Sequence, residues 1–353
     1  MAKNKYFSKL PLVIIMTAFL IYTVASPSVT AAGAAKGLCI CADVIIPSLF
    51  PFTVCVLFIM RSGITDQLKK ANSISQLLFG IDSECFTVFL LSMIGGYPVG
   101  ATLINELCKK GAVSEKDACR ILCCCINSGP AFIVLAVGNG MLASKELGYI
   151  LLVSHIFSSV MLLYVFACGK IERTNNTSVN RDISASECFV SATSDAAASV
   201  LSICNNVVIF SAFNAVLNSA FSNIFPIKYI TLFTEVTSAV SSTDNIYLIS
   251  FLLGFSGFCV WFQIISNAKS FKISPLKFVL SRILHGLFST AITFILCKII
   301  KPSLPTLSNH TVFFSAERKN GVAIGISIFC MTVLLIISLF GKKRYGNLRE
   351  DIV

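Results

Sequence analysis

The stretch IGGYPVGA, residues 94–101, lies halfway through an apolar segment of the chain. Its glycines and its proline interrupt a helix and leave backbone amide and carbonyl groups without helical partners. Hydrocarbon cannot form hydrogen bonds with such groups, so a helix that simply faces lipid is disfavoured here. We therefore predict that residues 85–108 form a re-entrant hairpin whose backbone is buried in protein or lines a wet cavity.

The rest of the sequence is also strongly apolar. Hydrophobic residues make up 55% of the 353 residues and charged residues only 13%, whereas soluble domains contain about 25% charged residues. A chain with so little polar surface needs a lipid bilayer around it. The net charge of +11 comes from short loops and a basic tail, which is typical of membrane topology signals rather than of a nucleic-acid partner.

The apolar runs predict an all-α polytopic membrane protein. A second interrupted stretch, 227–242, contains Glu235 among threonines and serines and is too polar to face lipid, so it predicts a second re-entrant hairpin. We expect about eight transmembrane helices, at residues 10–26, 36–60, 116–138, 147–168, 196–222, 246–266, 277–300 and 321–340.

The distribution of Lys and Arg places both termini in the cytoplasm. The first hairpin then enters from the inside and the second from the outside, so the two halves form an inverted repeat. The expected divisions are an N-terminal signal-anchor helix at 1–32, a first half at 33–168, a cytoplasmic polar linker at 169–195, a second half at 196–300, and a loop, last helix and basic tail at 301–353. An uncleaved anchor is favoured over a cleaved signal peptide because further spans follow.

Inverted repeats of broken helices place a substrate site near the middle of the membrane. Glycines allow a ligand to approach the backbone, and the amides at helix starts favour an anionic group. Tight packing through small residues is the alternative reading of the glycines, and hydrogen bonds between helices are an equal alternative for the asparagines and Ser256. The candidate substrate-binding residues are Gly95, Gly96, Tyr97, Pro98, Gly100, Asn127, Ser128, Gly129, Asn205, Asn206 and Ser256.

Glu235 is the acidic residue of its apolar stretch and is a candidate site for a coupling ion or a proton, together with Thr234 and Thr237. The alternative is a charge that sits near the membrane interface. His155 and His285 lie in apolar helices without an evident partner in sequence, and we interpret them as packing or interface residues.

No motif predicts catalysis or a cofactor. The 15 cysteines lie mostly inside apolar runs and lack zinc-type spacing with histidines, so no metal is expected. Metalloprotease, hydrolase and phosphate-loop patterns are absent from the sequence, which weakens the case for an enzyme or an ATP-driven pump.

Three blocks carry a family resemblance: PSLFPF at 47–52, GYPVGA at 96–101 and NSGPAF at 127–132. Together they resemble the YlbJ-type sporulation integral membrane proteins, within the nucleoside-recognition or Gate domain superfamily. The similarity covers roughly residues 35–300 and is looser around Glu235.

The resemblance implies a fold like that of the concentrative nucleoside transporters and a role in endospore formation. The task proposed for that family is to pass dipicolinic acid across the outer forespore membrane, in support of cortex formation. We therefore expect a transporter of a small anionic solute in the cell membrane or outer forespore membrane, with a coupling cation or proton. A non-transporting scaffold or assembly factor, a nucleoside carrier and a homo-oligomeric assembly stay open.

Overall fold

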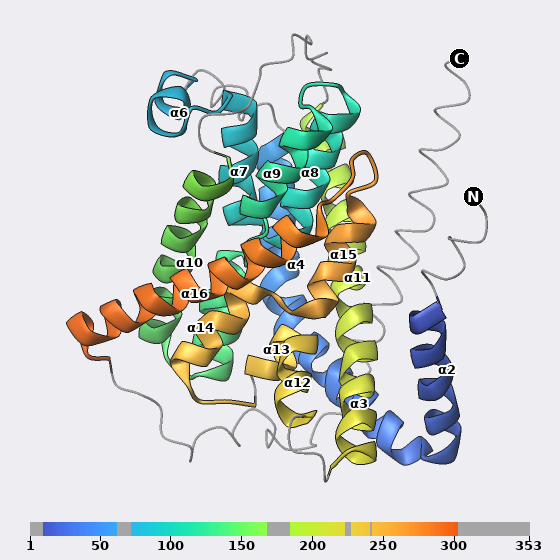
Figure 1. The fold of residues 1–353 in the computed structure, drawn as a ribbon. Helices are drawn as coiled ribbons and strands as arrows, with labels where there is room; N and C mark the ends of the chain where they lie inside the picture. The colour runs from blue at the N-terminus through green and yellow to red at the C-terminus, as the bar shows by residue number, and fades with distance from the viewer. Residues whose placement is uncertain (1–9, 62–71, 168–183, 223–226, 241, 303–353) are drawn as a thin grey trace, which may run out of the picture.

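The computed structural model describes residues 10–61, 72–167, 184–222, 227–240 and 242–302 (Figure 1). All regular elements in these ranges are helical, which confirms the predicted all-α class. They are α2 (Leu10–Ala25), α3 (Pro27–Ile40), η1 (Cys41–Ile45, π-helical), α4 (Ile46–Arg61), α6 (Asn72–Phe79), α7 (Ser83–Gly95), α8 (Tyr97–Lys109), α9 (Glu115–Cys124), η3 (Ala131–Met141, π-helical), α10 (Lys145–Phe166), α11 (Ala185–Ala220), α12 (Ile227–Thr234), α13 (Val236–Val240), α14 (Ile246–Phe255), α15 (Gly257–Asn267) and α16 (Pro275–Ile300).

Five helical segments of the described chain are long and apolar enough to cross a bilayer, which confirms a polytopic membrane protein. They are Pro27–Ile59, Lys145–Phe166, Ala185–Ala220, Ile246–Asn267 and Pro275–Ile300, and shorter apolar helices occupy Leu10–Ala25, Ser83–Gly95 and Ala131–Met141.

The boundaries of three expected spans differ from the prediction. The span expected at 196–222 already starts at Ala185, so α11 takes in the end of the linker expected at 169–195. The span expected at 36–60 already starts at Pro27, because a proline is well tolerated in the first turn of a helix. The span expected at 116–138 is divided into α9 and η3 by a non-helical stretch at 125–130. The span expected at 321–340 lies outside the described residues.

Hydrogen-bonding caps explain where the long helices begin. The hydroxyl of Ser184 accepts from the amide of Glu187, and the Glu187 carboxylate accepts in return from the amide of Ser184, so α11 starts with a complete capping box. Asn245 caps α14 by accepting from the amides of Tyr247 and Leu248.

The two interrupted stretches lie at opposite ends of the molecule, with α7 and α8 at the top of Figure 1 and α12 and α13 at the bottom. Helices α7 and α8 pack against each other, and so do α12 and α13. Residues 85–108 therefore fold back at Gly96, as the sequence predicts. Insertion of the two hairpins from opposite membrane faces stays a prediction.

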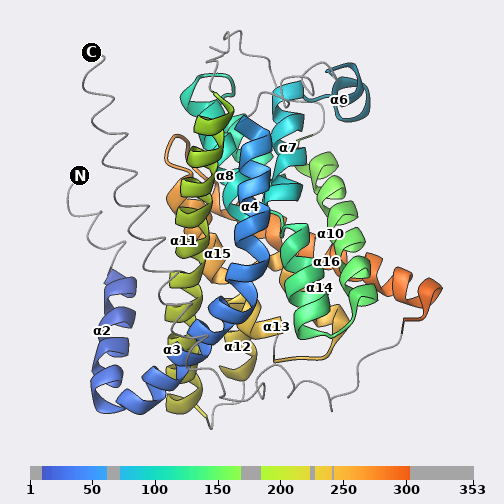
Figure 2. The ribbon, with the colours of Figure 1, turned by 180° about the vertical axis from the view of Figure 1, so that it is seen from behind.

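The two halves are interlocked. Helix α4 packs along α11, as Figure 2 shows from behind, and α10 packs against α16. Helix α10 of the first half also contacts α14 of the second, while α16 of the second half contacts α9 of the first. The inverted repeat of the two halves stays a prediction.

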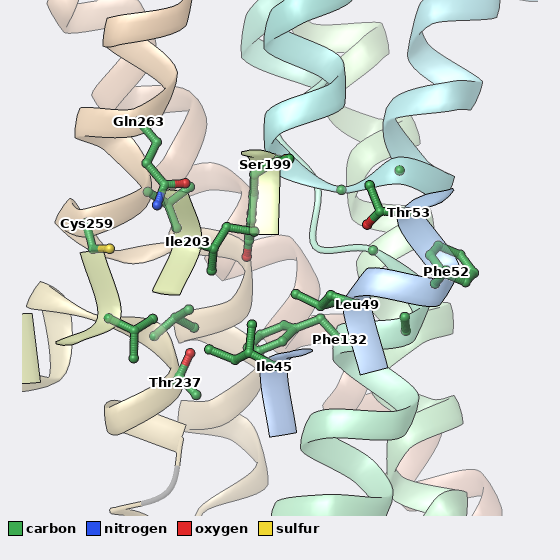
Figure 3. A pocket seen from close by; sticks show the side chains of 18 of the residues that line it. Ile45, Leu49, Phe52, Thr53, Phe132, Ser199, Ile203, Thr237, Cys259 and Gln263 are labelled. Atoms are coloured by element: carbon green, nitrogen blue, oxygen red, sulfur yellow. The ribbon is translucent and has the colours of Figure 1, made fainter. Parts of the chain in front are cut away.

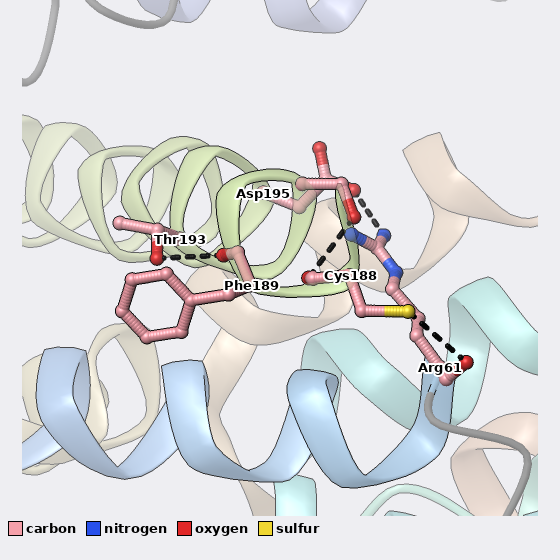
Figure 4. Close-up of polar contacts among 6 residues, drawn as sticks. Arg61, Cys188, Phe189, Thr193 and Asp195 are labelled. Carbon is pink, nitrogen blue, oxygen red and sulfur yellow. Dashed lines mark hydrogen bonds and ion pairs between the residues drawn. The ribbon is translucent and has the colours of Figure 1, made fainter. Parts of the chain in front are cut away.

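An ion pair joins the end of α4 to α11 (Figure 4). The guanidinium of Arg61 contacts the carboxylate of Asp195, and the thiol of Cys188 donates to the Arg61 carbonyl at 3.4 Å. The two charged side chains are 30% and 59% exposed, so the pair contributes at most about 1 kcal/mol to stability. Apolar packing of α4 on α11 therefore dominates this contact.

Candidate functional site

A cavity lies where the two interrupted stretches meet in the interior of the helical bundle (Figure 3). Its volume of about 60 Å³ is enough for about four water molecules. Helices α4 and α11 form one side of it, and the broken helices form the other. The lining residues are Ile45, Leu49, Phe52, Thr53, Ile94, Gly95, Gly96, Tyr97, Gly129, Ala131, Phe132, Ser199, Ile203, Val207, Glu235, Val236, Thr237, Cys259, Val260 and Gln263.

The first interruption is held by close backbone contact. Gly96 adopts φ +79° and ψ −171°, a conformation that essentially only glycine tolerates. A Cβ atom at Gly96 would lie 3.3 Å from the backbone nitrogen of Gly129, and one at Gly129 would lie 3.2 Å from the carbonyl oxygen of Ile94. The break between α7 and α8 therefore touches the break between α9 and η3.

The second half has the same arrangement. Gly257 adopts φ +70°, and a Cβ atom there would lie 3.2 Å from the backbone nitrogen of Val236. Ser256, just before it, also has a positive φ of 75°. The break between α14 and α15 therefore touches the break between α12 and α13, as the corresponding breaks do in the first half.

Glu235 occupies the break between α12 and α13 and is only 1% exposed. One carboxylate oxygen accepts from the amide of Thr237 at 2.7 Å, and the other accepts from the amide of Ser238 at 2.6 Å. The side chain thus caps the first turn of α13, where the exposed amides favour a negative charge. The structure places this carboxylate in the cavity wall rather than at the surface of the described chain.

The two threonines predicted beside Glu235 face different ways. Thr237 lines the cavity together with Glu235. The hydroxyl of Thr234 instead donates to Oδ1 of Asn214 on α11, at 2.7 Å. Only Thr237 of this pair is therefore in a position to share a ligand with Glu235 inside the cavity.

Tyr97 connects the cavity to the interior of the bundle. Its hydroxyl forms a hydrogen bond with the Ser128 hydroxyl and another, at 3.2 Å, to the carbonyl oxygen of Leu253. Tyr97 itself lines the cavity, while Ser128 is fully buried behind it. The two predicted residues thus come together, with the phenol ring between Ser128 and the cavity.

Asn127 is fully buried and holds the non-helical stretch 125–130, between α9 and η3, in place. Its Nδ2 donates to the Ser92 hydroxyl and to the carbonyl of Cys124, both at 3.1 Å. Its Oδ1 accepts from the Ser159 hydroxyl at 2.5 Å. Asn127 therefore positions the 125–130 stretch instead of lining the cavity.

Several candidates lie away from the cavity. Asn205 is exposed on α11, and Asn206 donates to the carbonyl of Ser202 in its own helix. The Ser256 hydroxyl donates to carbonyls of the preceding turn.

Two further candidates have roles in the backbone of α8. A Cβ atom at Gly100 would lie 2.3 Å from the Cys125 carbonyl oxygen, so Gly100 allows close packing. Pro98 lies in the first turn of α8, where it starts the helix.

A buried basic cluster went unrecognised in the sequence. His155 on α10 and His285 on α16 have ring centroids 4.3 Å apart. Arg282, also on α16, donates to the carbonyls of Ile126, at 2.6 Å, and Cys123. All three are at most 1% exposed. The histidines are thus hydrogen-bonded members of a polar network, and the signal for it was an arginine within an apolar span.

This network supports the break from the side opposite the cavity. Arg282 satisfies carbonyl groups at the end of α9, where a helix leaves acceptors without partners and carries a partial negative charge.

Among the described residues, no group of three or more His, Cys, Asp or Glu could hold a metal ion. The site is thus built from helix ends, one buried carboxylate and neutral polar groups.

No family model matches this chain, and no solved structure matches it. The chain is similar to the sporulation integral membrane protein YlbJ of Bacillus subtilis (strain 168), with 24% identity over 342 residues. The match covers 82% of this chain and 84% of that protein. The predicted resemblance to YlbJ-type proteins is confirmed, whereas the nucleoside-recognition or Gate domain superfamily stays a prediction. The chain is a polytopic integral membrane protein similar to YlbJ along most of its length.

Proposed function

We propose that this chain is a membrane carrier for a small anionic solute that acts during endospore formation. Dipicolinic acid is the proposed solute, and the outer forespore membrane is the proposed location, with cortex formation depending on the transfer. The observation that carries the proposal is the meeting of two broken helix pairs, from opposite ends of the molecule, around a cavity that contains Glu235. Similarity to a sporulation membrane protein supports the cellular setting.

The chemistry of the helix ends favours an anion. The starts of α8 and η3 contribute Gly96, Tyr97, Ala131 and Phe132 to the cavity wall, and helix starts carry partial positive charge. Arg282 adds a full positive charge behind the same break. The Tyr97 ring offers an aromatic surface for a flat solute such as dipicolinate.

The carboxylate of Glu235 opposes a dianion unless its charge is compensated. We propose that a cation or a proton binds at Glu235 beside Thr237, so that solute and ion enter the cavity together. The two amides that hold the carboxylate orient it for this role. Binding of the coupling ion at Glu235 would then determine whether the cavity accepts the solute.

The cavity is too small for dipicolinate as it stands. A volume of about 60 Å³ holds about four waters, whereas dipicolinate is a pyridine ring with two carboxylates. Transport therefore requires the broken helices to move relative to α4 and α11. Alternating access of this kind is the mechanism that inverted repeats support.

Uptake into proteoliposomes tests the proposal. Vesicles that contain the purified protein should accumulate labelled dipicolinate faster than protein-free vesicles, and excess unlabelled dipicolinate should compete. Vesicles that move no dipicolinate would overturn the proposal and favour the scaffold role. Uptake of a labelled nucleoside, with no uptake of labelled dipicolinate, would instead identify a nucleoside carrier.

A further inference from the structure

A second cavity of about 510 Å³ lies between α3, α11, α12 and α13. Its lining is rich in side chains that donate hydrogen bonds, and none of the described residues that line it carries a carboxylate. The lining residues with hydroxyl, amide or ammonium donors that the argument uses are Lys36, Ser211, Asn214, Asn218, Ser238 and Ser242. Hydroxyls, amides and one ammonium group are together suited to a small anion.

The two cavities share a wall made by the start of α13. Glu235, Val236 and Thr237 line the first cavity, whereas Ser238 and Ser242 line the second. The Ser238 amide holds the Glu235 carboxylate at 2.6 Å, while the Ser238 hydroxyl lies 3.2 Å from the Ser211 hydroxyl. One turn of helix thus separates the larger cavity from the buried carboxylate.

Lys36 provides the positive charge of the larger cavity. It lies in the apolar helical segment Pro27–Ile59, which is long enough to span a membrane. A lysine within such a segment is unfavourable in lipid and tends to mark a solute pathway or a wet cavity. The flanking glycines, Gly33 and Gly37, bring α3 so close to α11 that Cβ atoms there would lie under 3.0 Å from α11 atoms.

We propose that this larger cavity is an anion vestibule, in which Lys36 binds a small carboxylate solute on its way between water and the Glu235 cavity. The inference rests on the proposed carrier function and adds a second solute subsite to it. Two hydrogen bonds, Ser211 to Ser238 and Thr234 to Asn214, join α11 to the broken helix pair beside the larger cavity. These bonds form the barrier that opens when the solute passes.

The charge of Lys36 is tested by uptake kinetics in proteoliposomes with dipicolinate as the probe. Lys36→Gln should raise KM about tenfold, because a cation in a wet cavity attracts a carboxylate at close range, and should leave kcat within about twofold. Lys36→Arg should restore KM to near the wild-type value. Lys145→Gln, at an exposed lysine at the start of α10, is the matched control and should change neither constant.

A second variant protects the test against misfolding of the first. Ser242→Asp places a carboxylate at an exposed vestibule position and should also raise KM, by repulsion. Wild-type KM should rise with ionic strength, and this dependence should weaken in Lys36→Gln because the attracting charge is gone.

The outcomes separate the vestibule from the carrier function. Wild-type uptake with an unchanged KM in Lys36→Gln and Ser242→Asp would overturn the vestibule alone. Failure of Lys36→Arg to restore KM would assign Lys36 to packing, and would also overturn the vestibule. Absence of wild-type uptake would overturn the carrier function and the vestibule together.

Discussion

The backbone amide of Ser128 donates a hydrogen bond to Nε2 of His155, at 2.9 Å. An atom that accepts a hydrogen bond cannot carry a proton, so neutral His155 has its proton on Nδ1. That Nδ1 is buried and has no hydrogen-bond partner among the described residues. Arg282 and His285, on the facing helix α16, are the other basic groups of this network.

The direction of the hydrogen bonds can be followed through the whole network. The Ser159 hydroxyl donates to Asn127, so it accepts from His285 Nε2, which lies 3.2 Å away. Nδ1 of His285 then faces Nη1 of Arg282, at 3.4 Å, as an acceptor. The network thus connects α16, through α10, to the break that faces the cavity.

Replacement of His155 by phenylalanine should destabilise the protein. The buried Ser128 amide loses its acceptor, at a cost of about 1–3 kcal/mol, and the larger phenyl ring adds overpacking to a fully buried site. We expect a lower Tm for His155→Phe in detergent, and a smaller decrease for His155→Gln, whose amide oxygen can accept. Equal Tm values for His155→Phe and wild type would show that the hydrogen bond contributes nothing to stability.

Arg282→Met should be more damaging, because it removes a buried cation that donates to two carbonyls at the end of α9. Hydrogen bonds from a charged donor contribute about 1.5–3 kcal/mol each. Arg282→Lys should restore only part of the loss, since an ammonium lacks the planar fork that reaches both carbonyls. Thermal unfolding measures both variants.

Lys277→Gln, at an exposed residue on the same helix, is the control for Arg282 and should leave Tm unchanged. Full stability of Arg282→Lys would mean that charge, rather than the geometry of the guanidinium, supports the break.

Glu235→Gln should change the ion or pH dependence of dipicolinate uptake more than it changes dipicolinate affinity. The neutral amide keeps the shape of the side chain and one acceptor for the α13 amides, but it loses the negative charge that holds a cation or a proton. Uptake measured over a series of pH values and cation concentrations checks this. Glu146→Gln, at an exposed residue of α10, is the control, and an unaltered dependence in Glu235→Gln would contradict the coupling role.

Gly96→Ala should abolish or strongly reduce uptake, by more than about tenfold. The variant forces alanine into a conformation that costs about 1–3 kcal/mol, and its Cβ would press on Gly129. Gly111→Ala is a matched control, because Gly111 also has a positive φ, of 68°, but lies in the turn after α8, away from the cavity. Similar uptake in both variants would show that backbone strain alone, and not its position, determines the effect.

Local sequence chemistry predicted the interruptions well. Gly96 with its following proline, the 127–130 block and the polar residues around Glu235 all break helices in the structure. These breaks were predictable because Gly, Pro and buried polar groups act on the backbone of their own segment. The apolar runs likewise predicted the long helices, since lipid requires about 20 apolar residues for a span.

The partners of side chains were not predictable in the same way. Asn205 and Asn206 were candidates because they are polar, yet the cavity is lined by another stripe of α11, at Ser199, Ile203 and Val207. Asn205 lies on the opposite side of the helix, and Asn206 lies at the edge of this stripe and donates to the carbonyl of Ser202. Successive residues of a helix point about 100° apart, so the rotation of the whole helix decides which of them faces inward. That rotation is set by packing against α3 and α4.

The sequence alone determined that the chain is a membrane-embedded helical protein with broken helices, because each backbone group in hydrocarbon must find a hydrogen bond within its own segment. Only the tertiary structure decided that Arg282 reaches the carbonyl of Ile126, 156 positions away, and that Ser128 meets His155. Such contacts depend on how helices cross and rotate, which is the combined outcome of many weak packing contacts and not of any single segment.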